Sequence, residues 1–211
     1  GNQIRYIPRD LGHCQSLQVL SLSNNRLTQI PLEIGRCNKL KSLDLKDNPD
    51  IAVPPAYVIV QGPAKVSEYM QRYGMALTSC SLNLVKFKLR GFPSEITWTG
   101  SFLTELDLSN NSEISELPYS ISSLSQLRKL WIDKSNLEGR LTQGLGYLPS
   151  LTDLSLKSNQ ITSIPIGLGR ATQLKSISLE KNLSMSLPPK EIYSRGASAV
   201  LQFLHALVIG E

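Results

Sequence analysis

The stretch from Leu17 to Pro31, LQVLSLSNNRLTQIP, sets a frame that most of the chain repeats. Leu20 and Leu22 alternate around Ser21, so their side chains leave one face of a short strand. Asn25 ends the strand, where its amide can bond loop backbone groups that no sheet partner satisfies. A single copy cannot cover its own apolar face. Stacked copies must therefore bury a shared core and align a parallel sheet.

Seven copies of this frame follow one another along the chain. Successive copies are 23 or 24 residues long, except that 39 residues separate Leu43 from Leu82. Phe87 and Ser135 stand where the asparagine belongs, so we expect the turns of those two copies to be satisfied in another way. The copies open at Leu17, Leu40, Ser79, Leu103, Leu127, Leu151 and Leu174.

The extra residues between the second and third copies predict an inserted helix within Val53–Tyr73. Four apolar residues there recur at the spacing of one helix face, and Gly62 and Pro63 suit the start of a helix. The same design recurs 134 residues later in Leu187–Leu207. The four apolar residues are Val66, Tyr69, Met70 and Tyr73.

The 134-residue shift predicts a repeat of repeats. Residues 11–73 align without a gap on 145–207, with 22 identities in 63 positions. We expect residues 1–73 to be the end of one unit with its closing helix. Residues 74–211 are expected to form a second unit of five coils with its own closing helix, in one continuous solenoid.

Both ends of the chain suggest continuation. Asn2 takes the place of Asn25 in a copy whose strand is missing, which predicts a fragment of a longer protein. The last helix, Ala197–Ile209, is apolar nearly all round, and such helices are covered on both sides. We expect one side to seal the seventh coil. We also expect further repeats of the parent chain at both ends.

The frame and its seven copies resemble the leucine-rich repeat family. The resemblance implies an α/β solenoid with a curved parallel sheet of about seven short strands on the concave side. An inserted helix and a closing helix complete it. The segment Leu82–Ile96 and the PP…G…helix endings resemble arrays in Roco-type GTPases and other large intracellular multidomain proteins. No P-loop GxxxxGK[ST] occurs in the sequence, so we expect any GTPase domain to lie outside it.

Catalytic chemistry has little support in the sequence. His13 and His205 are the only histidines, and neither belongs to a catalytic or metal-binding motif. HExxH, GxSxG and Gly-rich phosphate loops do not occur. We therefore expect a protein that is not an enzyme and uses no cofactor or metal.

The cysteines favour a reducing, cytoplasmic setting. Cys14 and Cys37 lie one repeat apart and are interpreted as small apolar fillers, with a disulfide or a metal pair as the alternative. Cys80 is the third cysteine, and no CxxC pair is present. No apolar run of about 20 residues is present, so no membrane partner is expected.

The exposed strand positions argue for a protein partner. The chain has a net charge of +5. The three central outward positions of the seven copies nevertheless carry three lysines against six carboxylates. Phosphate binding needs the reverse, so nucleic acid is not expected as a partner. The basic run Lys86, Lys88 and Arg90 is interpreted as a solvated loop.

Trp131 is the one large aromatic residue among these outward positions, and the leucine frame does not require it. An aromatic anchor ringed by charge is typical of an interface hot spot. The alternative is that Trp131 only covers the sheet or packs on Lys129. The predicted binding residues are Trp131, Asp107, Lys129, Asp133, Ser155, Glu105 and Asp153.

The sequence therefore predicts a protein-interaction scaffold within a larger intracellular protein, with the partner on the concave face. Two alternatives remain at this point. The chain could be an architectural component of a large axonemal or cytoskeletal assembly. It could also be a regulatory array beside a GTPase or kinase domain.

Overall fold

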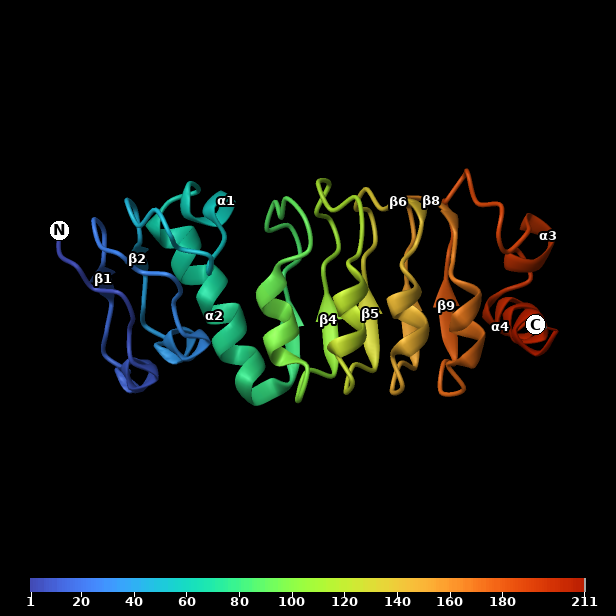
Figure 1. Cartoon of the computed structure of the whole chain (residues 1–211), viewed down its shortest axis with the longest axis horizontal. Coiled ribbons are helices and arrows are strands. Elements are labelled where there is room, and N and C mark those ends of the chain that lie inside the picture. Colours follow the sequence, from blue (N-terminus) through green and yellow to red (C-terminus); the bar gives the residue numbers. More distant parts are fainter. Residues whose placement is uncertain (211) are drawn as a thin grey trace. The chain divides into compact units, whose positions relative to one another are not determined.

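Short parallel strands and short 3-10 helices alternate along residues 1–210, the part of the chain that the computed structural model describes (Figure 1). The chain divides into two units, Gly1–Leu82 and the residues from Asn83 onward. Seven strands occupy the predicted leucine frame. They are β1 (Val19–Ser21), β2 (Ser42–Asp44), β3 (Ser81–Asn83), β4 (Glu105–Asp107), β5 (Lys129–Trp131), β7 (Asp153–Ser155) and β9 (Ser176–Ser178).

The first unit pairs β1 with β2 in parallel, with Leu20 opposite Leu43. Two 3-10 helices, η1 (Arg9–His13) and η2 (Leu32–Arg36), follow the prolines that end the preceding copies of the frame. The partial copy at the start contacts the next coil, where Ile4 N–H donates to Asn25 Oδ1 at 3.1 Å.

Two helices fill the long interval of the first unit, α1 (Ala56–Ile59) and α2 (Pro63–Ser79). The start of α2 is as predicted, but its end lies six residues beyond Tyr73. The apolar spacing ends at Tyr73, whereas the helical hydrogen bonds continue to Cys80 N–H on Ala76 O. The division of the sequence at residues 73 and 74 stays a prediction, and it falls inside this helix.

Close backbone contact fixes α2 against η2. A Cβ on Gly35 would lie 1.9 Å from Met70 O, and a Cβ on Gly74 would lie 2.1 Å from the carbonyl carbon of Gly35. Only glycine fits at either position. The fully buried Tyr69 and Tyr73 extend the core along the same helix.

An exposed ion-pair cluster lies along α2. Glu68 contacts Lys65 at 2.9 Å and Arg72 at 3.5 Å. Burial alone would raise the pKa of Glu68, but the hydrogen bonds and charges of Lys65 and Arg72 outweigh it and lower that pKa below its ordinary value.

The second unit carries a parallel sheet in which β4, β5, β7 and β9 are neighbours in that order. Leu106, Leu130 and Leu154 lie opposite one another in register and are buried. On the other side of each coil runs a 3-10 helix. These are η3 (Ser94–Thr99), η4 (Tyr119–Ser123), η5 (Gln143–Tyr147) and η6 (Ile166–Arg170).

A second small sheet, which the sequence did not predict, pairs β6 (Glu138–Arg140) with β8 (Gln160–Ser163). Its first strand, β6, lies in the segment NLEGRL, where the frame departs from its usual spacing. Gly139 adopts a φ of 63°, a backbone conformation that favours glycine. The irregular fifth copy thus builds additional hydrogen-bonded structure in place of a plain loop.

The second unit ends with α3 (Lys190–Tyr193) and α4 (Ala197–Ile209), whose bounds match the predicted apolar helix. Val200 and Leu204 are buried where α4 packs on η6 and β9. Ile209 is 70% exposed, and the covering of the second side by further repeats or a partner stays a prediction.

The two units repeat the same design 134 residues apart. Gly169 meets the backbone of Leu204 as Gly35 meets that of Met70, since a Cβ on Gly169 would lie 2.6 Å from Leu204 O. Isolated bridges join Gln29 to Val53 and Ser163 to Leu187. Positions related by the 134-residue shift therefore form equivalent contacts.

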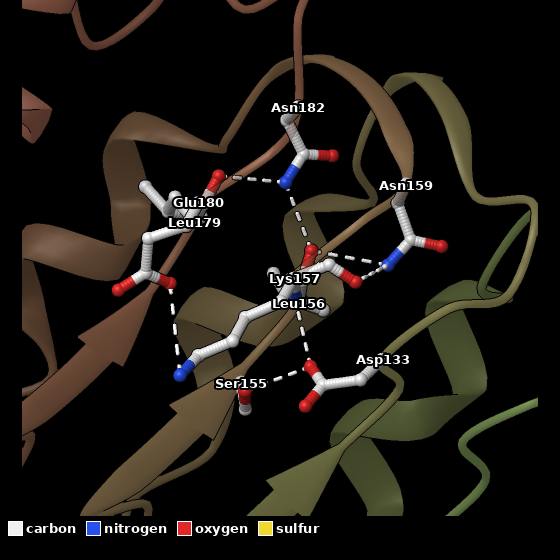
Figure 2. A network of polar contacts seen from close by, with 8 residues as sticks. All are labelled: Asp133, Ser155, Leu156, Lys157, Asn159, Leu179, Glu180 and Asn182. Carbon is white, nitrogen blue, oxygen red and sulfur yellow. Dashed lines mark hydrogen bonds and ion pairs between the residues drawn. The ribbon is translucent and has the colours of Figure 1, made fainter.

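A ladder of asparagine side chains binds the turns, as the frame predicts. Each Nδ2 donates to the carbonyl oxygen three residues earlier at 2.8–3.0 Å. Each Oδ1 accepts an N–H from the preceding coil at 3.0–3.2 Å. All are buried, and Figure 2 shows two of them. The asparagines are Asn25, Asn48, Asn111, Asn159 and Asn182.

The two copies without asparagine are satisfied differently. Phe87 is buried, and the carbonyl of Leu84 accepts from Asn111 Nδ2 of the next coil at 2.9 Å. Ser135 Oγ accepts from Asn111 N–H and donates to Leu108 O, both at 3.4 Å. The hydroxyl is thus a shorter and weaker substitute for the amide.

Candidate protein-binding face

Two rows of outward side chains cross the sheet of the second unit. Asp107, Trp131 and Ser155 lie opposite one another on β4, β5 and β7. Glu105, Lys129 and Asp153 form the adjacent row. The predicted neighbours of Trp131 are thereby confirmed.

A shallow hollow of about 360 Å³ lies on this face beside Trp131. Five predicted residues line it, whereas Glu105 and Asp107 lie outside its lining. The other lining residues at outward positions of the frame are Lys157, Ser176 and Ser178. They are not among the predicted binding residues, because no aromatic residue stands beside them in the sequence. The Trp131 hollow is lined by Lys129, Trp131, Asp133, Asp153, Leu154, Ser155, Lys157, Ser176 and Ser178.

Lys129 bridges the two rows. Its Nζ lies 2.9 Å from Glu105 Oε1 and 5.9 Å from the centroid of the Trp131 ring. The hydrogen bond and charge of Glu105, with a smaller contribution from Asp153, raise the pKa of Lys129. The packing of Trp131 on Lys129, foreseen as an alternative to a binding role, is therefore present.

Asp133 is held by the next coil. Its Oδ1 accepts from Ser155 Oγ at 2.7 Å and from Lys157 N–H at 2.8 Å (Figure 2). Its own N–H donates to Ser109 Oγ at 3.0 Å. The carboxylate is therefore fixed in orientation.

The exposure of Ser155 differs from the prediction. Its outward position in the frame suggested an accessible contact residue, but Ser155 is only 9% exposed. The hydroxyl turns toward Asp133 to form the bond described above. Ser155 thus contributes to the wall of the Trp131 hollow and orients Asp133.

The same network extends to the last strand. Lys157 Nζ lies 3.8 Å from Glu180 Oε2, and the two side chains are 46% and 65% exposed (Figure 2). Directly behind them, Asn159 and Asn182 both donate to Leu156 O. The face therefore rests on hydrogen-bonded strand ends, which hold its side chains in place.

The groups usually needed for catalysis do not converge on this face. His13 lies 3.8 Å from Asp10, and His205 Nδ1 lies 3.3 Å from Gly169 O. Within residues 1–210, no group of three or more histidine, cysteine, aspartate or glutamate side chains is placed to hold a metal.

Within residues 1–210, no disulfide joins the three cysteines. Cys37 is buried and its Sγ donates to Leu11 O at 3.2 Å. Burial and the neighbouring Cys14 raise the pKa of the Cys37 thiol. The interpretation as an apolar filler fits Cys37 but is wrong for Cys14, which is exposed.

Across the described helices, none combines the length and the apolar character needed to span a bilayer.

Comparison with known proteins places the chain in a family. Models of leucine-rich repeats match residues 15–53, as two copies, and residues 102–124 and 147–164. Together with the leucine frame and the asparagine ladder, these matches show that the chain belongs to the leucine-rich repeat family. Such repeats generally mediate protein–protein interaction and are typically not enzymatic.

Similar proteins include plant and bacterial members. The plant intracellular Ras-group-related LRR protein 8 of Oryza sativa subsp. japonica is 32% identical over 102 residues, which are 47% of this chain and 27% of that protein. A probable LRR receptor-like serine/threonine-protein kinase of Arabidopsis thaliana is 35% identical over 71 residues, or 33% of this chain and 8% of the kinase. The chain thus spans about a quarter or less of these relatives.

Among solved structures, a Leptospira interrogans LRR protein is similar to this chain. The match has a TM-score of 0.47 and 25% identity. It covers 90% of this chain and 49% of the other.

Proposed function

We propose that this chain is a protein-recognition module whose partner binds the sheet face of the second unit around Trp131. The observation that carries the proposal is the position of this indole. It lies half-buried beside a hollow, between a row of charged residues and a fixed carboxylate. The contact residues are those predicted, with Lys157, Ser176 and Ser178 added.

The proposal is supported by the small loss of conformational entropy that binding at Trp131 would require. A partner gains most from a large, rigid side chain whose orientation is already set, because little conformational freedom is then lost. Trp131 meets this condition, since Lys129 packs against its ring and Ser155 fills the next position in its row. The surrounding polar side chains would form the rim of such an interface.

The proposed context is a scaffold segment of a larger cytoplasmic protein, with further repeats at both ends. The name of the rice relative, an intracellular protein, supports the compartment. A second candidate is a regulatory array beside a kinase or GTPase domain. The name of the Arabidopsis relative, a kinase, favours this candidate.

Capture experiments with matched variants test the binding face. The wild-type chain, Trp131→Ala and Lys41→Ala would be immobilised, and the retained proteins identified from an extract of the source tissue. Lys41 is exposed in the first unit and serves as the control. Calorimetry on a retained partner should then show a loss of about 2 kcal/mol, roughly thirtyfold, for Trp131→Ala and little change for Lys41→Ala. Equal retention by all three proteins would contradict the proposal.

A further inference from the structure

The charges around the Trp131 hollow do not balance. Lys129 and Lys157 are each paired with a glutamate, at 2.9 Å and 3.8 Å. Three aspartates remain, and in the described part of the chain none of them forms an ion pair. Two lysines against five carboxylates leave an excess of three negative charges on this small area. The three aspartates are Asp107, Asp133 and Asp153.

Two of these carboxylates flank the indole. Asp107 on β4 lies in the row of Trp131, and Asp153 on β7 lies in the adjacent row. Neighbouring strands are about 4.8 Å apart, so either carboxylate is within reach of a side chain that stacks on the ring. Lys129 Nζ already lies 5.9 Å from the ring centroid, a distance at which the ring face attracts a cation.

Resting on the proposed function, we infer that the partner presents a basic, extended segment with an arginine at the Trp131 hollow. A guanidinium can stack on the indole while two of its N–H groups bind the carboxylate of Asp107 or of Asp153. An ammonium has no planar fork of N–H groups, so it cannot stack flat on the ring and bind both oxygens of a carboxylate. A segment running across β4, β5 and β7 would follow one row of side chains from strand to strand.

The orientation of the acidic groups strengthens the inference. Asp133 is held by Ser155 and by the backbone of Lys157, so its charge cannot turn away from the hollow. Asp107 Oδ1 accepts from Ser109 N–H at 2.9 Å and is held on its own strand. A phosphorylated or acidic segment would therefore face fixed negative charge on this face.

The test uses a phage-displayed library of random 12-residue peptides. The library would be panned on the intact 211-residue chain and, in parallel, on Trp131→Ala. Peptides that distinguish the two proteins should contain arginine and carry more basic than acidic residues. Fluorescence anisotropy of a selected peptide should show affinity losses of about fivefold for Asp107→Asn and for Asp153→Asn, and none for Lys41→Ala. Affinity should also fall as salt rises.

The outcomes separate the two proposals. Asparagine keeps the shape and the side-chain oxygen of aspartate, so a loss would report the charge. Selected peptides that depend on Trp131 but are acidic or uncharged would overturn the basic segment and leave the binding face intact. If no peptide distinguishes wild type from Trp131→Ala, both the basic segment and the Trp131 face are overturned.

Discussion

Replacing Asn159 by alanine should remove one rung of the buried asparagine ladder. Its Nδ2 donates to Ile132 O at 2.7 Å, and its Oδ1 accepts from Leu137 N–H at 3.1 Å. In the variant these two backbone groups lose their partner. Leu156 O, which Asn159 also binds, keeps its bond from Asn182 Nδ2 at 2.9 Å. Lys157 O, a fourth partner, keeps the 2.9 Å bond from Lys134 N–H, so two of the four groups are left unsatisfied.

The magnitude follows from those two groups. A buried backbone group without a partner costs about 1–3 kcal/mol. The turn lies near the surface, so we take about 1–2 kcal/mol for each and expect a total loss of about 2–4 kcal/mol. With a urea m-value of about 3 kcal/mol/M, the midpoint of unfolding should fall by about 1 M. Circular dichroism and tryptophan fluorescence would follow the transition.

Ser135→Ala is the matched control at the equivalent position of the preceding coil. Ser135 forms only long bonds, of 3.4–3.5 Å, and Leu108 O retains the 2.8 Å bond from Asn111 Nδ2. We expect a loss of about 0.5–1 kcal/mol. Equal losses in the two variants would refute the argument that the amide ladder carries the turns.

Three further substitutions test the core, the helix packing and the charges. Leu108→Asp places a carboxylate at a fully buried position and should cost several kcal/mol, seen as a lost or lowered melting transition by circular dichroism. Gly169→Ala should cost about 1–3 kcal/mol in urea unfolding, because its Cβ would press on Leu204 O, whereas Gly167→Ala has ordinary contacts and should be tolerated. The pKa of Glu68 is lowered in the folded chain, so its ionised side chain stabilises the fold at pH values above the pKa that Glu68 has in the unfolded chain. This stabilisation is lost as pH falls through the folded-state pKa of Glu68. Glu68→Gln should therefore cost less than about 1 kcal/mol at pH 7, since the group is 44% exposed, and nothing near pH 3.

The core-facing side chains and the strand register could be predicted from the sequence. The leucine frame must face the core, so it determines the strand register, and Leu106, Leu130 and Leu154 lie where it places them. The glycine and proline at Gly62 and Pro63 marked the start of α2. These signals work because burial and backbone conformation each permit few residue types.

The solvent-facing side chains and the loops could be predicted only in part. The frame placed Trp131 and its strand neighbours, because register follows from the inward leucines. It could not reveal that Ser155 turns to Asp133, since that bond depends on side-chain rotamers in two coils. The pairing of β6 with β8 was missed for a similar reason, because it arises from loop backbone and not from apolar spacing.

The central claim is that recognition uses the Trp131 face, and the two tryptophans of the chain allow a direct test. Trp98 lies on η3, away from the sheet strands, and is 48% exposed. A ¹⁵N-labelled sample gives one indole N–H signal for each tryptophan, assigned with Trp98→Phe. Titration with a captured partner should shift or broaden the Trp131 signal and leave that of Trp98 in place. A shift of the Trp98 signal with an unchanged Trp131 signal would place the partner on the helical side of the coils and contradict the account.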